Sequence, residues 1–216
     1  MLVITYRKLL LTHCQARRGL PNARPRAIYK SMRISETDIL LVPGLGNSGP
    51  DHWQRRWLEK MPNAQWIEQD NWDQPEFESW LANIERAILM ATRPVVLVGH
   101  ALGSIAIVHT AHRLTDTKVR GAFLVAVPDI DRNPNVAPQA APFAGPPRDP
   151  LPFPSMMIAA STDPFCTLER AADLANAWGS DFHDAGDAGH INTESGHGPW
   201  PDGMMMFARF MQRLKS

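Results

Sequence analysis

The chain has 216 residues, a formal net charge of zero, 44% hydrophobic and 20% charged residues. This composition suits one globular domain with a sizeable core. The neutral charge balance gives no reason to expect nucleic acid or a membrane surface as a partner, and no apolar run approaches the roughly 20 residues that cross a bilayer. The two cysteines, Cys14 and Cys166, lie far apart and form no metal motif, which favours a reducing compartment.

The first 35 residues differ from the rest, because they contain no Asp or Glu but eight Lys or Arg residues. An Arg-rich and acid-poor leader is typical of a mitochondrial transit peptide. The alternative is that translation starts at Met32 and the upstream residues come from an earlier start codon. Under both interpretations residues 1–35 form a flexible extension and residues 36–216 a single domain. We expect a bacterial cytoplasmic location, or mitochondrial import if the extension is real.

The first confident strand is predicted over residues 38–42, an apolar run that a glycine-rich turn follows at 43–50. Three glycines in that turn let the backbone bend tightly and expose its N–H groups. The turn is either a plain strand-to-helix connection or half of an oxyanion hole. A helix should follow, with Asp51 as its N-cap and an end near Met61. A short strand is expected at 65–68 and an amphipathic helix at 73–92.

The most informative stretch is Pro94–Ser104, which reads PVVLVGHALGS. Its mostly β-branched start predicts a strand buried on both faces, as in a parallel sheet. Two glycines, Gly99 and Gly103, then bracket a tight turn that leads into a helix-like segment. Strand, Gly-x-x-x-Gly turn and helix is the layout of a nucleophile elbow. The centre of the turn is Ala101, however, and a methyl group cannot attack a carbonyl.

The second half of the chain continues the alternation of strands and helices. Residues 128–154 hold nine prolines, which predict a long loop that could cover a pocket. The remaining elements are expected as strands at 121–127, 155–160 and 180–183, and as helices at 168–178 and 201–214. This order predicts an α/β fold with a doubly wound, mostly parallel sheet and helices on both faces. In such sheets the site lies at the carboxyl ends of the strands.

Three residues follow predicted strands in the order nucleophile, acid, histidine: Ala101, Asp163 and His190. His190 would act as general base and then general acid, and Asp163 would fix its tautomer. The backbone N–H groups of Leu45 and Leu102 would stabilise the oxyanion. Taken singly, Asp163 reads as a turn residue and His190 as a surface residue. Their joint order after successive strands favours the site.

Other reactive arrangements are weaker. His109 and His112 are three residues apart, but no further metal ligand is evident near them. The group His183, Asp184, Asp187 and His190 does not have the spacing of an open metal site. We therefore expect neither a metal nor another cofactor. Ser104 and Cys166 are not expected to replace the missing nucleophile, since both lie away from the apex of the elbow.

From about Ile39 onward the chain resembles the small serine hydrolase family that includes retinoblastoma-binding protein 9 and its bacterial relatives. The residues that carry the resemblance are VPGLGNSGPDHWQ from Val42, VVLVGHALGS, RDPLPFPS from Arg148, STDPF and, most specifically, GHINTESGHGPWPDG from Gly189. The resemblance implies a compact α/β-hydrolase with no large cap domain and a Ser-His-Asp triad. Asp163 and His190 match triad positions, whereas His197 does not. The serine of the family falls on Ala101.

Three functions remain open at this stage. The first is a hydrolase of a small ester, amide or thioester, with Ala101 as an inactivating change. The second is a natural pseudoenzyme that binds a small molecule or a protein, and the third is an interaction protein whose pocket has no role. His52, Trp53 and Trp200 are candidates for the pocket wall, although core packing would equally explain both tryptophans. The expected partner is a small acyl compound, and the oligomeric state is left open.

Overall fold

The computed structural model describes residues 32–114 and 118–215 of the chain. Its centre is a six-stranded sheet in the order β2-β1-β3-β4-β5-β6, in which every neighbouring pair is parallel. The strands are β1 (Asp38–Val42), β2 (Ala64–Trp66), β3 (Val95–His100), β4 (Val119–Val125), β5 (Ser155–Ala159) and β6 (Asp181–Asp184). The predicted parallel sheet is thus confirmed.

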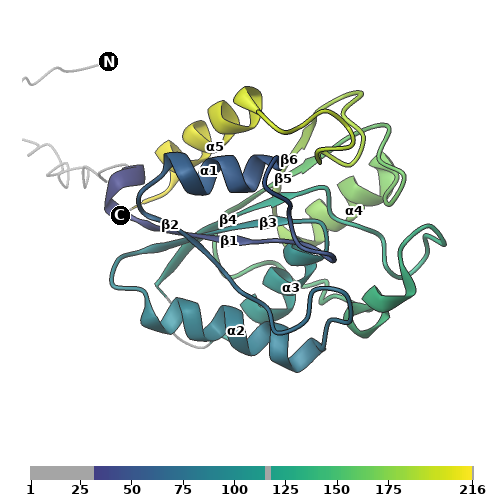
Figure 1. Cartoon of the computed structure of the whole chain (residues 1–216), viewed down its shortest axis with the longest axis horizontal. Helices are drawn as coiled ribbons and strands as arrows, with labels where there is room; N and C mark the ends of the chain where they lie inside the picture. The colour runs from purple at the N-terminus through teal and green to yellow at the C-terminus, as the bar shows by residue number, and fades with distance from the viewer. Residues whose placement is uncertain (1–31, 115–117, 216) are drawn as a thin grey trace, which may run out of the picture.

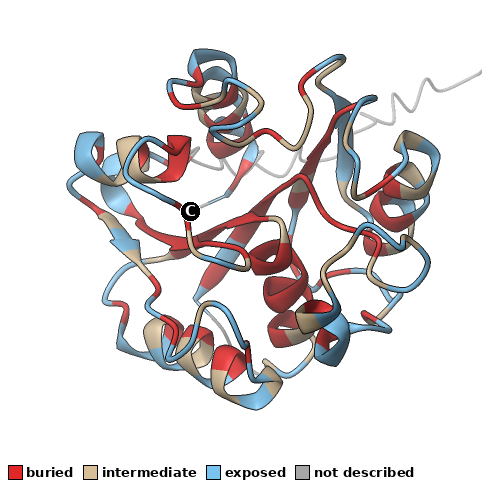
Figure 2. Ribbon diagram, turned by 45° about the vertical axis from the view of Figure 1, so that its right-hand side comes forward, coloured by how far each residue is buried: buried red, intermediate tan, exposed pale blue. Residues whose placement is uncertain are grey.

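Helices cover both faces of the sheet (Figure 1), as the alternating pattern predicts. Helices α1 (Trp53–Lys60) and α5 (Pro201–Arg213) pack on one face, where Trp57 and Phe207 belong to one buried cluster. The opposite face carries α2 (Phe77–Met90), α3 (Leu102–Ala111) and α4 (Leu168–Trp178), with a second buried cluster between them and the sheet. The buried colouring of Figure 2 follows the central strands and α3. Burial on both faces explains why β3 is an unbroken apolar run.

The strand order reverses between β1 and β3, because the chain runs outward from β1 to β2 and then returns to the other side. The loops that follow β1 and β3 therefore diverge at the carboxyl ends of two adjacent strands. Such a reversal leaves a crevice in which parallel sheets bind their ligands. The elbow and the glycine-rich turn, the two motifs that the sequence singles out, meet at this place.

The N-terminal boundary of the packed region lies earlier than predicted. Met32 is buried, and its N–H donates a hydrogen bond to the carbonyl of Leu214 at 3.1 Å. A 3-10 helix, η1 (Ile34–Glu36), then leads into β1. The core thus includes Met32, which the sequence analysis assigned to the extension. The remaining part of the predicted extension, residues 1–31, lies outside the described residues.

Three local predictions need correction. The N-cap of α1 is His52, not Asp51, since the His52 ring accepts the N–H of Gln54. Helix α2 begins at Phe77 and not at residue 73, because the side chain of Asn71 accepts the N–H groups of residues 73 and 74 and holds a turn there. The Pro-rich segment contains a 3-10 helix, η2 (Pro138–Phe143).

The connection between β4 and β5 holds η2 as its one helical element, so the described residues contain no cap domain. Their helices are all too short or too polar to cross a membrane. The β2 strand spans residues 64–66 where 65–68 was expected, and the other strand and helix boundaries lie within a few residues of the predicted ones.

Candidate active site

The turn after β3 has the backbone of a nucleophile elbow. Ala101 has a φ of 48° and a ψ of −123°, a conformation that is strained for any residue with a side chain. The residues two positions before and two positions after it must be glycine. A Cβ on Gly103 would lie 2.2 Å from the carbonyl oxygen of Val42, and one on Gly99 would lie 2.7 Å from the Cα of Ser104. The absence of side chains at Gly99 and Gly103 therefore lets α3 pack closely against the sheet, with the Ala101 methyl at the apex of the turn.

Two backbone donors flank Ala101. The loop after β1 lies against the elbow, since a Cβ on Gly44 would be 3.0 Å from the Ala101 Cβ and 3.3 Å from the Leu102 nitrogen. Within the described residues, no atom accepts a hydrogen bond from the N–H of Leu45 or of Leu102. Both residues line the same cavity as Ala101. They are therefore free to donate to an oxygen placed above the elbow, which is the role the sequence assigns to them.

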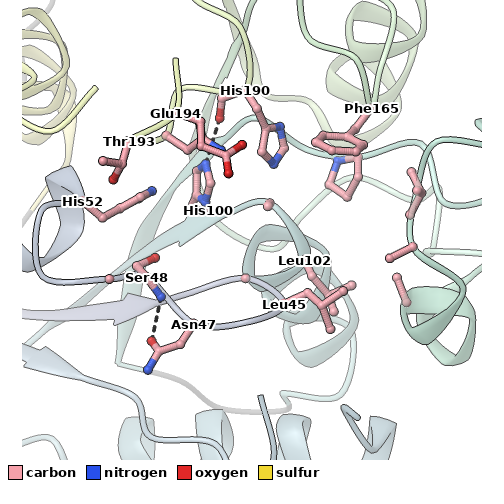
Figure 3. Close-up of a pocket in the computed structure, with 18 residues that line it drawn as sticks. Leu45, Asn47, Ser48, His52, His100, Leu102, Phe165, His190, Thr193 and Glu194 are labelled. Atoms are coloured by element: carbon pink, nitrogen blue, oxygen red, sulfur yellow. Dashed lines mark hydrogen bonds between the residues drawn. The ribbon is translucent and has the colours of Figure 1, made fainter. Parts of the chain in front are cut away.

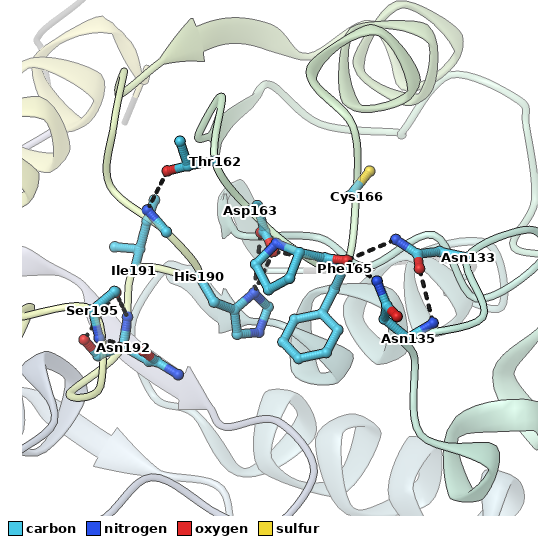
Figure 4. A network of polar contacts seen from close by, with 12 residues as sticks. Asn133, Asn135, Thr162, Asp163, Phe165, Cys166, His190, Ile191, Asn192 and Ser195 are labelled. Atoms are coloured by element: carbon cyan, nitrogen blue, oxygen red, sulfur yellow. Dashed lines mark hydrogen bonds and ion pairs between the residues drawn. The ribbon is translucent and has the colours of Figure 1, made fainter.

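The acid and the base predicted from the sequence are in contact. His190 Nδ1 lies 3.0 Å from each carboxylate oxygen of Asp163, so the ring donates to that carboxylate (Figure 4). The Asp163 side chain is 2% exposed and also accepts the N–H of Phe165 at 2.9 Å. The Phe165 ring packs edge-on against His190 with centroids 4.6 Å apart. These contacts fix the imidazole, whose Nε2 has no partner among the described residues.

Two further histidines extend from His190 in a row. The ring of His100 lies 5.0 Å from that of His190 and donates from Nε2 to the His190 carbonyl at 3.0 Å. The ring of His52 lies 4.7 Å from that of His100. Since His52 Nδ1 accepts the Gln54 N–H, the ring proton of His52 is on Nε2, which is buried and has no hydrogen-bond partner in the described part of the chain.

Burial keeps His52 and His100 neutral. Desolvation, and then the nearby His190, lower the pKa of His52 from 6.5 to about 4. Desolvation also lowers the pKa of His100 well below its ordinary value, with smaller contributions from His52 and His190. His100 and His52 therefore carry no charge at neutral pH. His100 instead acts through its hydrogen bond, which ties the residue before the elbow to the backbone of His190.

The elbow, the two donors and His190 line one cavity of about 340 Å³ (Figure 3). One side of the cavity is apolar, and we call it the apolar half. It comprises Leu45, Leu102, Pro128, Val136, Ala137, Ala140 and Phe165. The other side, the polar half, comprises Asn47, Ser48, His52, His100, Asn192, Thr193 and Glu194. Ala101 and His190 lie in the wall between them.

The residues matched by a family model settle the classification. The model described as Serine hydrolase matches residues 39–209, which is most of the chain. The chain belongs to the Serine hydrolase family. Among solved structures, a protein described as a YdeN-like hydrolase from Pectobacterium atrosepticum is 34% identical. The alignment covers 85% of this chain and 95% of that one, with a TM-score of 0.76.

More distant structures share the fold. The ydeN gene product of Bacillus subtilis is 18% identical with a TM-score of 0.68. The alignment covers 82% of this chain and the whole of the Bacillus chain. An esterase domain of a Rhodothermus marinus protein is 15% identical with a TM-score of 0.59. The alignment covers 83% of this chain and 87% of that domain. These structures establish the α/β-hydrolase fold, and the family model places the chain in a family of hydrolases. Comparison with curated proteins gives no match, and the closer resemblance to retinoblastoma-binding protein 9 stays a prediction.

The three residues that the sequence suggests for the pocket wall lie in different places. His52 lines the cavity, but Trp53 and Trp200 do not. Trp53 is fully buried and donates from Nε1 to the Ile191 carbonyl at 2.9 Å, which holds the segment after His190. Trp200 is 7% exposed and packs against Trp53. Both tryptophans thus belong to the core, the alternative that the sequence left open.

Ser104 and Cys166 are two side chains near the site that could in principle act as nucleophiles. Ser104 is fully buried, and its hydroxyl is bonded to the backbone of Val125 in β4. Cys166 is buried as well, and burial followed by the carboxylates of Asp129 and Asp163 raises the pKa of its thiol to about 12. Neither residue lines the cavity. Neither can therefore take the place of the hydroxyl that Ala101 lacks.

Most of the histidines and acids in the two candidate metal-binding groups have other partners. His109 and His112 each bond to backbone carbonyls, and Asp184 accepts the N–H of Gly186. Asp187 accepts a hydrogen bond from the hydroxyl of Thr162.

The contributions of His100 and Phe165 are functional features that sequence reasoning missed. Their signals were present, since His100 ends the central strand and Phe165 is two residues from the predicted acid.

Proposed function

We propose that the chain binds a small ester, amide or thioester in the cavity beside Ala101 and does not turn it over through an acyl-enzyme. The observation that carries the proposal is the methyl group of Ala101 at the apex of an elbow whose backbone is strained in the manner of a nucleophile turn. The rest of the hydrolytic machinery, Asp163 with His190 and the free N–H groups, surrounds that methyl group.

The roles of the residues follow from their geometry. The carbonyl oxygen of the substrate would accept from the N–H groups of Leu45 and Leu102, which polarises the carbonyl carbon. His190 Nε2 would take a proton from an attacking group and return it to the leaving group, while Asp163 stabilises the imidazolium. With Ala101 no atom is available to form the acyl bond. Loss of a triad serine costs about 10⁶-fold in turnover in a well-studied protease.

The decisive experiment is Ala101→Ser followed by a fluorophosphonate label. The protein with Ala101 should take no label and should show no burst of product. The Ala101→Ser variant should gain one label, located by mass spectrometry on residue 101, and should hydrolyse p-nitrophenyl butyrate. The double variant Ala101→Ser with His190→Ala should lose both properties. A folded Ala101→Ser protein that takes no label and hydrolyses no ester would overturn the assignment of the site.

A natural pseudoenzyme is the second candidate. The intact pairing of Asp163 with His190 favours instead a hydrolase in which Ala101 is an inactivating change, because an idle site has little reason to keep the pair. If the chain is a natural pseudoenzyme, the unchanged protein binds its acyl ligand and releases it intact. Thermal shift and mass analysis of the recovered ligand would detect this. The genomic codon at position 101 separates the two candidates, since an alanine codon there means that binding without turnover is the native behaviour.

A further inference from the structure

The charge inside the cavity points to a class of substrate, on the premise that the proposed function is correct. Of the 18 residues that line the cavity, one is an acid, Glu194, and none is a lysine or an arginine. Glu194 belongs to the segment after His190 and forms the outer edge of the polar half. Figure 3 shows its carboxylate turned into the cavity beside the ring of His100.

Several exposed acids of the domain have no ion pair, and Glu194 is the one among them that lines the cavity. Asp129 pairs with Arg170, Glu78 with Arg113 and Asp181 with Arg213, whereas no cation within the described residues pairs with Glu194. The absence of a partner is physically consistent with its exposure, because water solvates the charge at the cavity mouth. The carboxylate remains available to a cation that enters the cavity.

The histidines beside Glu194 do not offset its charge. His100 and His52 are buried and neutral at neutral pH, because burial lowers the pKa of each ring. The polar half thus presents one negative charge, two neutral rings and uncharged amide and hydroxyl groups. An anionic ligand would be repelled by Glu194 without any compensating cation in the wall, whereas a cationic ligand would be attracted.

The apolar half has a different preference. Val136, Ala137 and Ala140 from the Pro-rich segment line it together with Phe165, so it suits a short hydrocarbon chain. The substrate carbonyl lies between the halves, at the elbow. We propose that the natural ligand is an ester with a short apolar acyl chain and an alcohol portion bearing a substituted ammonium group, and that Glu194 is the specificity-determining residue that binds this cation.

The test compares two esters of nearly equal shape, butyrylcholine and 3,3-dimethylbutyl butyrate, which differ by one positive charge. The Ala101→Ser enzyme should favour butyrylcholine in kcat/KM by roughly fivefold, the size expected for a partly exposed ion pair. Glu194→Gln should bring that ratio close to one, because it keeps the shape and removes the charge. Raising the salt concentration to about 0.5 M should also shrink the ratio.

Glu59→Gln is the matched control, because Glu59 is exposed on α1 and does not line the cavity. This variant should keep the preference for butyrylcholine. Equal hydrolysis of the two esters by the Ala101→Ser enzyme would overturn the inference and leave the proposed function standing. Hydrolysis of neither ester by the folded variant would count against the proposed function itself.

A further outcome separates binding from catalysis. If Glu194→Gln lowers kcat for both esters by the same factor, Glu194 acts on His190 and not on the cation, and the inference is wrong. Calorimetry on the protein with Ala101 provides a second measurement that needs no engineered serine. There butyrylcholine should bind more tightly than its neutral analogue, and Glu194→Gln should remove the difference.

Discussion

The elbow and the pair of loops that face it differ in what they retain. The elbow keeps every steric feature of a nucleophile turn: the positive φ of Ala101, the close approach at Gly103 and the contact with Gly44. It lacks the reactive atom. The loops after β5 and β6 keep the reactive groups, Asp163 and His190, at hydrogen-bond distance. The backbone conformation of the elbow therefore does not depend on the nucleophilic atom, because the conformation is kept here and the hydroxyl is missing.

The same contrast explains how the fold tolerates the missing hydroxyl. A serine Oγ at position 101 would contribute to no core contact, because the side chain faces the cavity. Gly99 and Gly103, by comparison, have no room for even one added carbon. Stability thus depends on the frame and reactivity on the atoms that the frame displays. Four predictions test this division, beginning with the largest effect.

The largest effect concerns the reactive side. In the Ala101→Ser background, His190→Ala should lower kcat for p-nitrophenyl butyrate by about 10⁶-fold, because the base is removed. Asp163→Asn should lower it by about 10⁴-fold, because the base remains but its tautomer is wrong. Steady-state kinetics measure both, and His183→Asn on the exposed edge strand is the control. Equal losses for the control and for His190→Ala would contradict the assignment.

The next effect concerns the frame. Gly103→Ala should destabilise the domain by about 3 kcal/mol or more, since the new Cβ would lie 2.2 Å from one backbone oxygen and 2.4 Å from another. Gly49→Ala in the nearby turn is the control, because nothing lies within 4 Å of a Cβ there. Urea unfolding measures the difference. A Gly103→Ala protein as stable as the control would show that the elbow is not tightly packed.

The third effect concerns the Pro-rich segment that forms the apolar half. Arg170 is 10% exposed and binds Asp129 and Asp131 of this segment at 3.1 and 3.3 Å. Arg170→Met should cost about 3 kcal/mol, because it leaves the buried Asp129 without a partner. Arg148→Met should cost less than about 1 kcal/mol, since its pair with Asp173 is half exposed.

Urea unfolding and limited proteolysis measure this pair of variants. The segment at 128–154 should be cleaved faster in Arg170→Met than in Arg148→Met, because its anchor to α4 is lost. If the two arginine variants behave alike, the segment is held by its apolar contacts and not by the charge network.

The smallest effect is the pH dependence of the stability that arises from His52, next to the elbow. The folded pKa of His52, about 4, lies below its unfolded value of 6.5, so the unfolded chain binds more protons between these values. Stability should therefore fall as the pH drops from about 6.5 towards 4, with His52 alone contributing a loss of about 2 kcal/mol at pH 5. The low pKa of His100 adds to the same trend.

Unfolding midpoints between about pH 7.5 and pH 5 measure this slope. His52→Asn should flatten it, because asparagine keeps an oxygen that can cap α1 but has no group that titrates in this range. An unchanged slope in this variant would assign the acid sensitivity to other groups.

Much of the fold could be predicted, because its signals are local. Apolar runs predict the central strands, helical periodicity predicts α2, and paired glycines mark the elbow at Ala101. Asp163 and His190 could be proposed as partners, because parallel strands place their following loops at one edge of the sheet. The acid–base contact at 3.0 Å agrees with that expectation.

The remaining features depend on contacts between distant segments. The hydrogen bond from His100 to the His190 carbonyl joins residues ninety positions apart, and no sequence pattern predicts such a contact. Trp53 and Trp200 lie in motifs near the site, yet the packing of α1 against α5 places both in the core. The start of the packed region at Met32 depends likewise on its backbone bond to Leu214.

The methyl group of Ala101 also affects how the occupancy of the cavity depends on time and on ligand concentration. In a working hydrolase the residence of an acyl compound ends with its conversion, so occupancy depends on turnover. On the proposed function, the bound compound leaves by dissociation, and its lifetime equals the inverse of its off-rate. Occupancy then follows the free concentration of the ligand through a single equilibrium constant. Under that proposal the cavity has the binding properties of a receptor, and its occupancy depends on ligand concentration instead of on the rate of turnover.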